Sequence, residues 1–193
     1  MSDSVSQLIV GTEFSPLSAR RRVVEVGSGK GLFLCRYAQS HPDCELIGLE
    51  LAKKYAEMSQ AKLIKLGHVN ACCLAADACR WMADQPAESF DEVHVYFPDP
   101  WWKKRHKKRR VLNEAMVRNI ESVLKTPGEL HFWTDVLEYF ESTLELLAST
   151  TKLIGPEFVP ETEAADDMDY QTHFERRTRR NQLPVYRSLF RKS

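Results

Sequence analysis

Short apolar runs alternate along the chain with longer stretches in which apolar residues recur at helical spacing. The short runs are rich in β-branched and aromatic side chains, and they predict strands at residues 23–26, 44–50, 69–74, 92–96 and 130–134. The helical spacing predicts helices from 32 to the His41-Pro42 break and at 52–66, 78–82, 111–124 and 136–149. Farther along, strands are expected near Phe158 and at 185–190, with a basic helix at 172–180 between them.

Strand and helix alternate five times in this pattern, which predicts an α/β fold with a doubly wound, Rossmann-like sheet. The sheet is expected to be mostly parallel, with an antiparallel C-terminal strand. No repeat or linker divides residues 20–193, so they are predicted to form a single domain. Residues 1–19 show no clear period and are expected to be a polar, partly mobile lead-in.

Composition narrows the class of protein. The five cysteines include no C-x-x-C pair and the six histidines no H-E-x-x-H motif, which argues against a disulfide framework and against a metal site. No apolar run reaches membrane-spanning length, and the N-terminus lacks the order of a signal peptide. These features predict a cytoplasmic protein with no membrane partner. A monomer or a homodimer is expected, and composition does not distinguish them.

Charge is balanced in total but segregated along the chain. Lys plus Arg and Asp plus Glu both number 27, yet seven of the eight residues from 103 to 110 are Lys or Arg. Further arginines follow at 176–191, and acids gather between the two basic stretches, at 157–169. Such segregation makes a one-sided field that can steer a polyanion such as RNA. The alternative for the 103–110 run is a solvated face with no partner.

Three acids follow the first three predicted strands. Glu25 precedes the turn Gly27-Ser28-Gly29-Lys30-Gly31, Glu50 closes the second strand, and Asp77 follows the third. Ligands of doubly wound sheets bind at this edge, where glycines permit close approach of the backbone. A carboxylate at Glu25 would repel the pyrophosphate of NAD but suits the sulfonium and ammonium of S-adenosylmethionine. Glu50 is suited to accept from ribose hydroxyls and Asp77 from an adenine amino group. NAD, another nucleotide, and a glycine turn without a ligand remain the alternatives.

Asp99 lies where the fourth strand gives way to the basic run. Pro98 and Pro100 flank it, and a residue before proline is held out of helical geometry. Trp101 and Trp102 follow, and an indole here either stacks on a substrate base or packs in the wall of the site. An acid fixed beside a cationic segment predicts a catalytic or recognition carboxylate next to a polyanion-binding arm.

Six motifs occur in a fixed order: Glu25-Val26-Gly27-Ser28-Gly29-Lys30-Gly31, Ile47-Gly48-Leu49-Glu50, Phe97-Pro98-Asp99-Pro100-Trp101, Lys104-Arg105-His106 with Lys108-Arg109-Arg110, Thr134-Asp135 and Thr172-x-x-Glu175. Together they resemble the tRNA (guanine-N7-)-methyltransferase family, from about residue 23 to the C-terminus. The resemblance implies a class I methyltransferase fold, S-adenosylmethionine as cofactor, and tRNA as substrate, with guanosine 46 of the variable loop as the target.

The resemblance also implies roles for individual residues. Glu25, Glu50 and Asp77 would bind S-adenosylmethionine together with the glycine turn, and Asp99 would be the acidic residue of the catalytic site and border the cofactor. Residues that would contact tRNA are Lys103, Arg105, His106, Lys107, Lys108, Arg109, Arg110, Asp135, Thr172 and Glu175. Thr134-Asp135 also suits a helix N-cap, and Thr172 with Glu175 has the spacing of a capping box, so local structure alone could account for both.

Two other functions stay open on the sequence. One is a methyltransferase that acts on another RNA or on a small molecule, although a cationic arm benefits only a polyanionic substrate. The other is a catalytically impaired RNA-binding subunit of a methyltransferase complex, or an enzyme that needs a helper subunit. The presence of Glu25, Glu50, Asp77 and Asp99 together favours an active enzyme.

Overall fold

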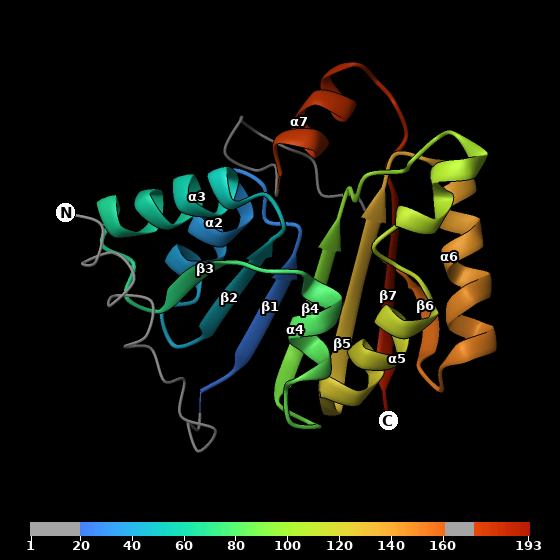
Figure 1. Ribbon diagram of the computed structural model, residues 1–193, viewed down its shortest axis with the longest axis horizontal. Coiled ribbons are helices and arrows are strands. Elements are labelled where there is room, and N and C mark those ends of the chain that lie inside the picture. The colour runs from blue at the N-terminus through green and yellow to red at the C-terminus, as the bar shows by residue number, and fades with distance from the viewer. Residues whose placement is uncertain (1–19, 161–171) are drawn as a thin grey trace.

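The computed structural model describes residues 20–160 and 172–193 and contains one seven-stranded sheet (Figure 1). The expected lead-in at 1–19 and most of the acidic stretch lie outside the described residues. The strands are β1 (Arg22–Val26), β2 (Glu45–Glu50), β3 (Ala71–Ala75), β4 (Phe90–Tyr96), β5 (Leu124–Thr134), β6 (Ile154–Phe158) and β7 (Tyr186–Lys192).

The strand order is β3-β2-β1-β4-β5-β7-β6. Strands β1 to β5 pair in parallel, whereas β7 is antiparallel to both of its neighbours, β5 and β6. The order reverses between β1 and β4, so the first strand and the fourth are neighbours at the switch point where doubly wound sheets bind ligands. The predicted α/β sheet with an antiparallel C-terminal strand is therefore confirmed.

Helices cover both faces of this sheet. α2 (Leu32–Ser40) and α3 (Lys53–Lys65) pack on one face, and α4 (Ala78–Ala83), α5 (Glu114–Val123) and α6 (Leu137–Thr150) pack on the other. Two further elements are a 3₁₀ helix, η1 (Lys104–Arg109), and α7 (His173–Arg180). In Figure 1, α7 lies beyond the C-terminal ends of β4 and β5 instead of covering a face. No helix among the described residues has the length and apolar character to cross a bilayer.

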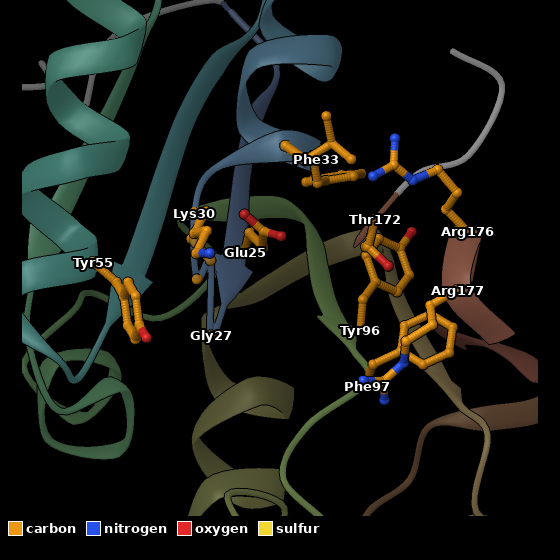
Figure 2. A pocket seen from close by; sticks show the side chains of 13 residues that line it. Glu25, Gly27, Lys30, Phe33, Tyr55, Tyr96, Phe97, Thr172, Arg176 and Arg177 are labelled. Carbon is orange, nitrogen blue, oxygen red and sulfur yellow. The ribbon is translucent and has the colours of Figure 1, made fainter. Parts of the chain in front are cut away.

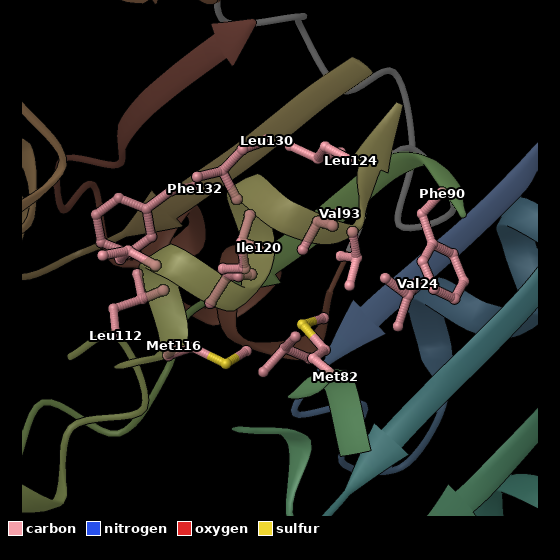
Figure 3. Close-up of a cluster of buried hydrophobic side chains, with 14 of the residues drawn as sticks. Val24, Met82, Phe90, Val93, Leu112, Met116, Ile120, Leu124, Leu130 and Phe132 are labelled. Atoms are coloured by element: carbon pink, nitrogen blue, oxygen red, sulfur yellow. The ribbon is translucent and has the colours of Figure 1, made fainter. Parts of the chain in front are cut away.

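The larger hydrophobic core lies between the sheet and the helices α4, α5 and α6. Val24, Val93 and Phe132 project from the sheet toward Met116 and Ile120 of α5, and all five are fully buried (Figure 3). Successive strand residues point to opposite faces. Val23, next to Val24 in β1, therefore belongs with its β2 partner Leu46 to a second core beneath α2 and α3. The two cores hold β1 and β4 rigidly, which fixes the loops at their C-terminal ends.

Two predicted boundaries differ from the structure. The helix expected from residue 111 begins at Glu114, because the Asn113 side chain accepts a hydrogen bond from the Met116 amide and caps it. The segment between the helix expected to end at 124 and the strand expected from 130 lies within β5, as an irregularity in its pairing with β4. The bulge shifts the register between the pairs Phe90–Leu124 and Glu92–Glu129.

The buried face of α5 gives a direct test of the core. Ile120 is fully buried, whereas Ile64 on α3 is 58% exposed. Ile120→Ala is expected to lower the free energy of unfolding by about 2–5 kcal/mol, since it removes buried methyl groups and leaves a cavity. Ile64→Ala is the matched control and is expected to change it by less than about 0.5 kcal/mol. Urea denaturation measures both, and equal losses would contradict the packing described here.

Candidate active site

A cavity of about 660 Å³ opens at the C-terminal edge of the sheet, beside the switch point (Figure 2). One wall consists of Glu25 and the glycine turn that follows β1. The opposite wall consists of Tyr96 and Phe97 at the end of β4, with Thr172 and residues 176–177 of the α7 segment above them. The cavity therefore joins the glycine turn to the segment in which substrate-binding residues are expected.

Glu25 is a buried acid in the wall of the cavity. Its side chain points into the cavity, its residue is 3% exposed, and neither its Oε2 nor the Ser28 Oγ has a hydrogen-bond partner among the residues described. Burial raises the pKa of Glu25 to about 8; the nearby Ser28 hydroxyl opposes this shift, and the charge of Glu50 adds to it. A carboxyl group in this state gains most from a cationic ligand, which would restore its charged form.

The glycine turn is open where a ligand would approach. Gly27 and Gly29 have φ values of 79° and 52°, and a Cβ added to either would meet nothing within 4 Å. These left-handed conformations favour glycine, and the free space leaves the backbone accessible. Gly31 differs, because a Cβ there would lie 2.9 Å from the Ser59 side chain, so its small size serves the packing of α2 against α3.

Glu50 holds the turn in place from the neighbouring strand. Its Oε2 accepts from the Gly29 amide at 2.9 Å, and its Oε1 accepts from the Ala52 amide at 2.8 Å. Asp77 stands one strand farther along the same edge, where its Oδ1 accepts from the amides of Cys79 and Arg80 and caps α4. Neither acid lines the cavity itself. Both extend its edge in the order β1, β2, β3, as a ligand longer than the cavity would require.

The loop that carries Asp99 has a strained backbone. Phe97 and Trp101 both have φ of 48°, a conformation uncommon for residues other than glycine, and they flank Asp99 on both sides. Asp99 is exposed, and its Oδ1 accepts from the Trp101 amide at 3.1 Å. Strained backbone of this kind concentrates at functional sites, where the surrounding structure compensates its cost. The loop thus presents one carboxylate at the edge of the sheet in a defined position.

The basic run that follows divides into two groups. Lys103, Arg105, Lys108 and Arg109 are exposed. Arg110 is buried, and the half-buried Lys107 forms an ion pair with Glu138. Among the residues of this run whose side chains are described, the first group is therefore the most accessible to a polyanion.

The two indoles also differ in their surroundings. Trp101 packs against this basic run, with the His106 ring 5.9 Å away in T-shaped contact and the Arg109 guanidinium 5.0 Å from its ring. Trp102 is 71% exposed. Of the two, Trp102 is the indole that remains open for stacking on a base.

The expected substrate residues outside this run gather around α7. Thr172 caps α7 by accepting from the Glu175 amide at 3.0 Å, and Thr178 donates to Asp135 Oδ2 at 3.3 Å. Glu175 is 3% exposed and forms an ion pair with Arg187 of β7 at 3.2 Å. The capping interpretation thus holds for Thr172, whereas Asp135 instead ties β5 to α7. The structure brings Asp135, Thr172 and Glu175 together at one end of the sheet, with Thr172 in the cavity wall.

Tyr96 and Phe33 line the cavity although the sequence did not single them out. The Tyr96 hydroxyl lies 2.7 Å from His94 Nδ1, and His94 Nε2 lies 2.7 Å from Glu92. Burial lowers the pKa of His94 to about 3, so the ring is neutral. The carboxylate of Glu92 therefore accepts from His94 Nε2, and His94 Nδ1 accepts from Tyr96. The three residues alternate along one face of β4, a spacing that predicts a shared face but not the hydrogen bonds between their side chains.

Glu92, His94 and His131 could in principle hold a metal ion, as their ligand atoms lie within 4.8 Å of one another. The two imidazole rings, however, are stacked with centroids 4.5 Å apart and planes 14° from parallel. Metal-binding lone pairs lie in the ring planes, so here they run side by side instead of converging on one point. Glu92 also accepts from Tyr37 and pairs with Arg21. The cluster is better explained as a hydrogen-bonded network.

Comparison with known proteins agrees with this geometry. A family model described as a putative methyltransferase matches residues 19–188. The tRNA (guanine-N(7)-)-methyltransferase of Rhodopirellula baltica is 49% identical over 177 residues, which cover 88% of this chain and 65% of that protein. The chain thus spans less than two thirds of that relative's length.

Two further similarities extend the comparison. A protein of the same name from Alkalilimnicola ehrlichii is 34% identical over 176 residues, covering 89% of this chain and 72% of that protein. In fold, a crystal structure of a precorrin-6y C5,15-methyltransferase from Geobacter metallireducens matches with a TM-score of 0.61 at 17% identity, over 92% of this chain and 85% of that one. On its sequence relationships and its fold, this chain belongs to the tRNA (guanine-N7-)-methyltransferase family.

Proposed function

We propose that the protein transfers a methyl group from S-adenosylmethionine to N7 of a guanine in tRNA, with guanosine 46 as the target. One observation carries the proposal: a single cavity joins the buried Glu25 and the glycine turn to Thr172 and the α7 segment. A methyl donor and its acceptor must meet in one water-poor space. One wall of this cavity carries Glu25, an acid suited to a cationic ligand, and the other is formed by the end of β4 and the α7 segment.

The residues present fit S-adenosylmethionine. Glu25 would pair with its cationic amino-acid end, and the open backbone at Gly27 and Gly29 would lie along it. Glu50 and Asp77 follow in order along the edge, as ribose and adenine would require. Glu25 disfavours NAD, since an acid whose ionisation is already suppressed by burial would have to accommodate a pyrophosphate.

The reaction requires the methyl donor and guanine N7 to be aligned, and it requires no proton transfer at N7. S-adenosylmethionine supplies an electrophilic methyl group: the sulfur–carbon bond breaks, a nitrogen–carbon bond forms, and the positive charge moves from sulfur to the purine. Guanine N7 has a lone pair and no proton, so no residue has to act as a base there. Asp99, whose Oδ1 accepts from the Trp101 amide, lies outside the lining of the cavity, and in this proposal it would stabilise the positive charge that develops on the purine.

Recognition of guanine and of RNA would fall to different groups. Asp135 is an acid near α7 that can accept from guanine N1 and N2, and Lys103 can donate to O6 or to a phosphate. Glu175, which is 3% exposed and paired with Arg187, would have to leave that ion pair to take part. The exposed Arg105, Lys108 and Arg109 would contact phosphates without selecting sequence, and His106 would be carried among them. The macromolecular partner in this proposal is tRNA. A monomeric or homodimeric state, with or without a helper subunit, remains a prediction.

A transfer assay tests the proposal. The protein is incubated with S-adenosylmethionine labelled at the methyl group and with unmodified tRNA, and 7-methylguanosine is mapped by chemical cleavage at the modified base. Label at guanine N7 of position 46 is the expected result. Label at another atom or in another RNA would overturn the assigned substrate. Binding of cofactor and tRNA without transfer would identify an RNA-binding subunit instead.

Asp99 and Lys108 should separate catalysis from binding. Asp99→Asn keeps an oxygen for the Trp101 amide but removes the charge, so we expect kcat to fall at least ~100-fold with little change in tRNA affinity. Lys108→Ala should weaken tRNA binding and reduce the slope of log affinity against log salt by about one. Single-turnover rates and filter binding at several salt concentrations measure both. Equal losses of rate and affinity in both variants would refute the division.

Glu25 should reveal its role through stability. An unfolded glutamate ionises near pH 4.5 and Glu25 in the folded state near pH 8, so between these values the folded state binds more protons and stability falls as pH rises. Glu25→Gln cannot ionise, and without ligand it should be more stable than wild type at pH 8 by more than about 1 kcal/mol. The advantage should vanish near pH 4.5.

The same variant should bind S-adenosylmethionine at least ~10-fold more weakly at pH 8, because it loses a charge-assisted contact. Urea denaturation at the two pH values and calorimetric titration at pH 8 provide the measurements. A variant whose stability tracks wild type at both pH values would show that the carboxyl is not buried in neutral form.

A further inference from the structure

We propose that Arg110 and Glu138 form a clamp that positions the Asp99 loop, so that Arg110 acts on the reaction as a positioning residue and not as an RNA contact. This inference rests on the proposed function for its kinetic consequences. It departs from the expectation that the whole stretch 105–110 lies along RNA. Its basis is the set of hydrogen bonds that Arg110 makes inside the protein.

Arg110 uses its guanidinium group on three neighbours at once. Its Nε donates to the Pro100 carbonyl at 2.9 Å, one residue beyond Asp99. Its two terminal nitrogens donate to the Glu138 carboxylate at 3.3 and 2.5 Å, and one of them also donates to Ser142 Oγ at 3.2 Å. The group lies 4.3 Å from the centre of the Tyr139 ring. With its side chain only 8% exposed, it is poorly placed to reach a phosphate.

Glu138 is the acid that makes this arrangement possible. It lies in the first turn of α6, where the helix dipole favours an anion. Hydrogen bonds from Arg110 and then from Lys107 lower the pKa of Glu138 to about 2, so it is charged throughout the physiological range. Its Oε1 also accepts from Lys107 Nζ at 2.6 Å. One carboxylate at the start of α6 therefore binds Lys107 in the last turn of η1 and Arg110 directly after η1.

The clamp supports a loop whose backbone is strained. Phe97 and Trp101 hold left-handed backbone conformations that the chain would not adopt unaided. Arg110 links the carbonyl of Pro100, which lies between Asp99 and Trp101, to a helix anchored in the core through the buried Tyr139. Only a planar, bidentate donor can serve Glu138 and Pro100 together, because an ammonium group is a point charge on a flexible stem.

The decisive variants are Glu138→Gln and Arg110→Lys. Glu138→Gln should lower kcat about 10-fold, because small displacements of a catalytic group are costly. The same change releases Lys107 from its ion pair, so tRNA affinity should hold or rise and its salt slope should steepen by up to about one. Arg110→Lys keeps the positive charge but cannot donate to Pro100 and to both Glu138 oxygens at once. It should also lower kcat, while the salt dependence of tRNA binding stays unchanged.

Glu141→Gln, an exposed position on the same helix, is the matched control and should leave kcat and affinity at wild-type values. If Arg110 contacted RNA, Arg110→Lys would retain activity, and Arg110→Ala would weaken binding and lower the salt slope with kcat unchanged. That pattern, or an unaltered kcat in Glu138→Gln, would overturn the clamp.

A readout that needs no catalysis separates this inference from the proposed function. Hydrogen exchange of the segment 98–110 should be faster in Glu138→Gln than in Glu141→Gln, since the Trp101 and Arg110 amides lose the frame that protects their hydrogen bonds. If wild type transfers no methyl group, the proposed function fails and exchange still tests the clamp. Equal exchange in the two variants would refute the clamp whatever the enzyme does.

Discussion

A carboxyl group buried near the end of β1, whose Oε2 has no hydrogen-bond partner among the described residues, is the constraint to which the site is adapted. Glu25 lies where the sheet order reverses, between the glycine turn and the end of β4. Its desolvation costs stability in the absence of a ligand, and that cost makes sense if a cation completes the site. The open glycine backbone, the cavity and the neighbouring strand-end acids Glu50 and Asp77 can all be understood around this one group.

Residues that support the site are separate from residues that are exposed to a substrate. Strands β1 and β4 are held by two hydrophobic cores, and the loops after them carry Glu25 and Asp99. The basic run continues this division on a smaller scale: Arg110 and Lys107 face Glu138, while Lys108 and Arg109 face solvent. Charges that are alike in sequence therefore serve two purposes, one inside the molecule and one toward a polyanion.

Much of the fold followed from local sequence signals, because apolar periodicity and breakers act over a few residues. The strands, the helices on both faces and the antiparallel C-terminal strand were predictable on this basis. The start of α5 was missed, because capping by Asn113 competes with an apolar pattern that continues through Val111. The long β5 was also missed, since its bulge at 125–128 resembles a turn when its pairing with β4 is unknown.

The site was predictable to a lesser degree. Motifs indicated Glu25, the glycine turn and Asp99, whose chemistry lies in their own residue types. The partners that determine what these groups do lie far away in sequence: Glu138 is 28 residues from Arg110, and Thr178 is 43 from Asp135. Contacts of this kind depend on tertiary structure, so a run of seven basic residues among eight gave no hint that one of them is buried.

Proton release on cofactor binding tests the central claim most directly. Calorimetric titration of S-adenosylmethionine at pH 7, in buffers of different ionisation enthalpy, measures the protons exchanged for each ligand bound. Because the pKa of Glu25 is about 8 before binding, the account predicts release of nearly one proton in wild type and none in Glu25→Gln. Binding without proton release in wild type, or no binding at all, would contradict it.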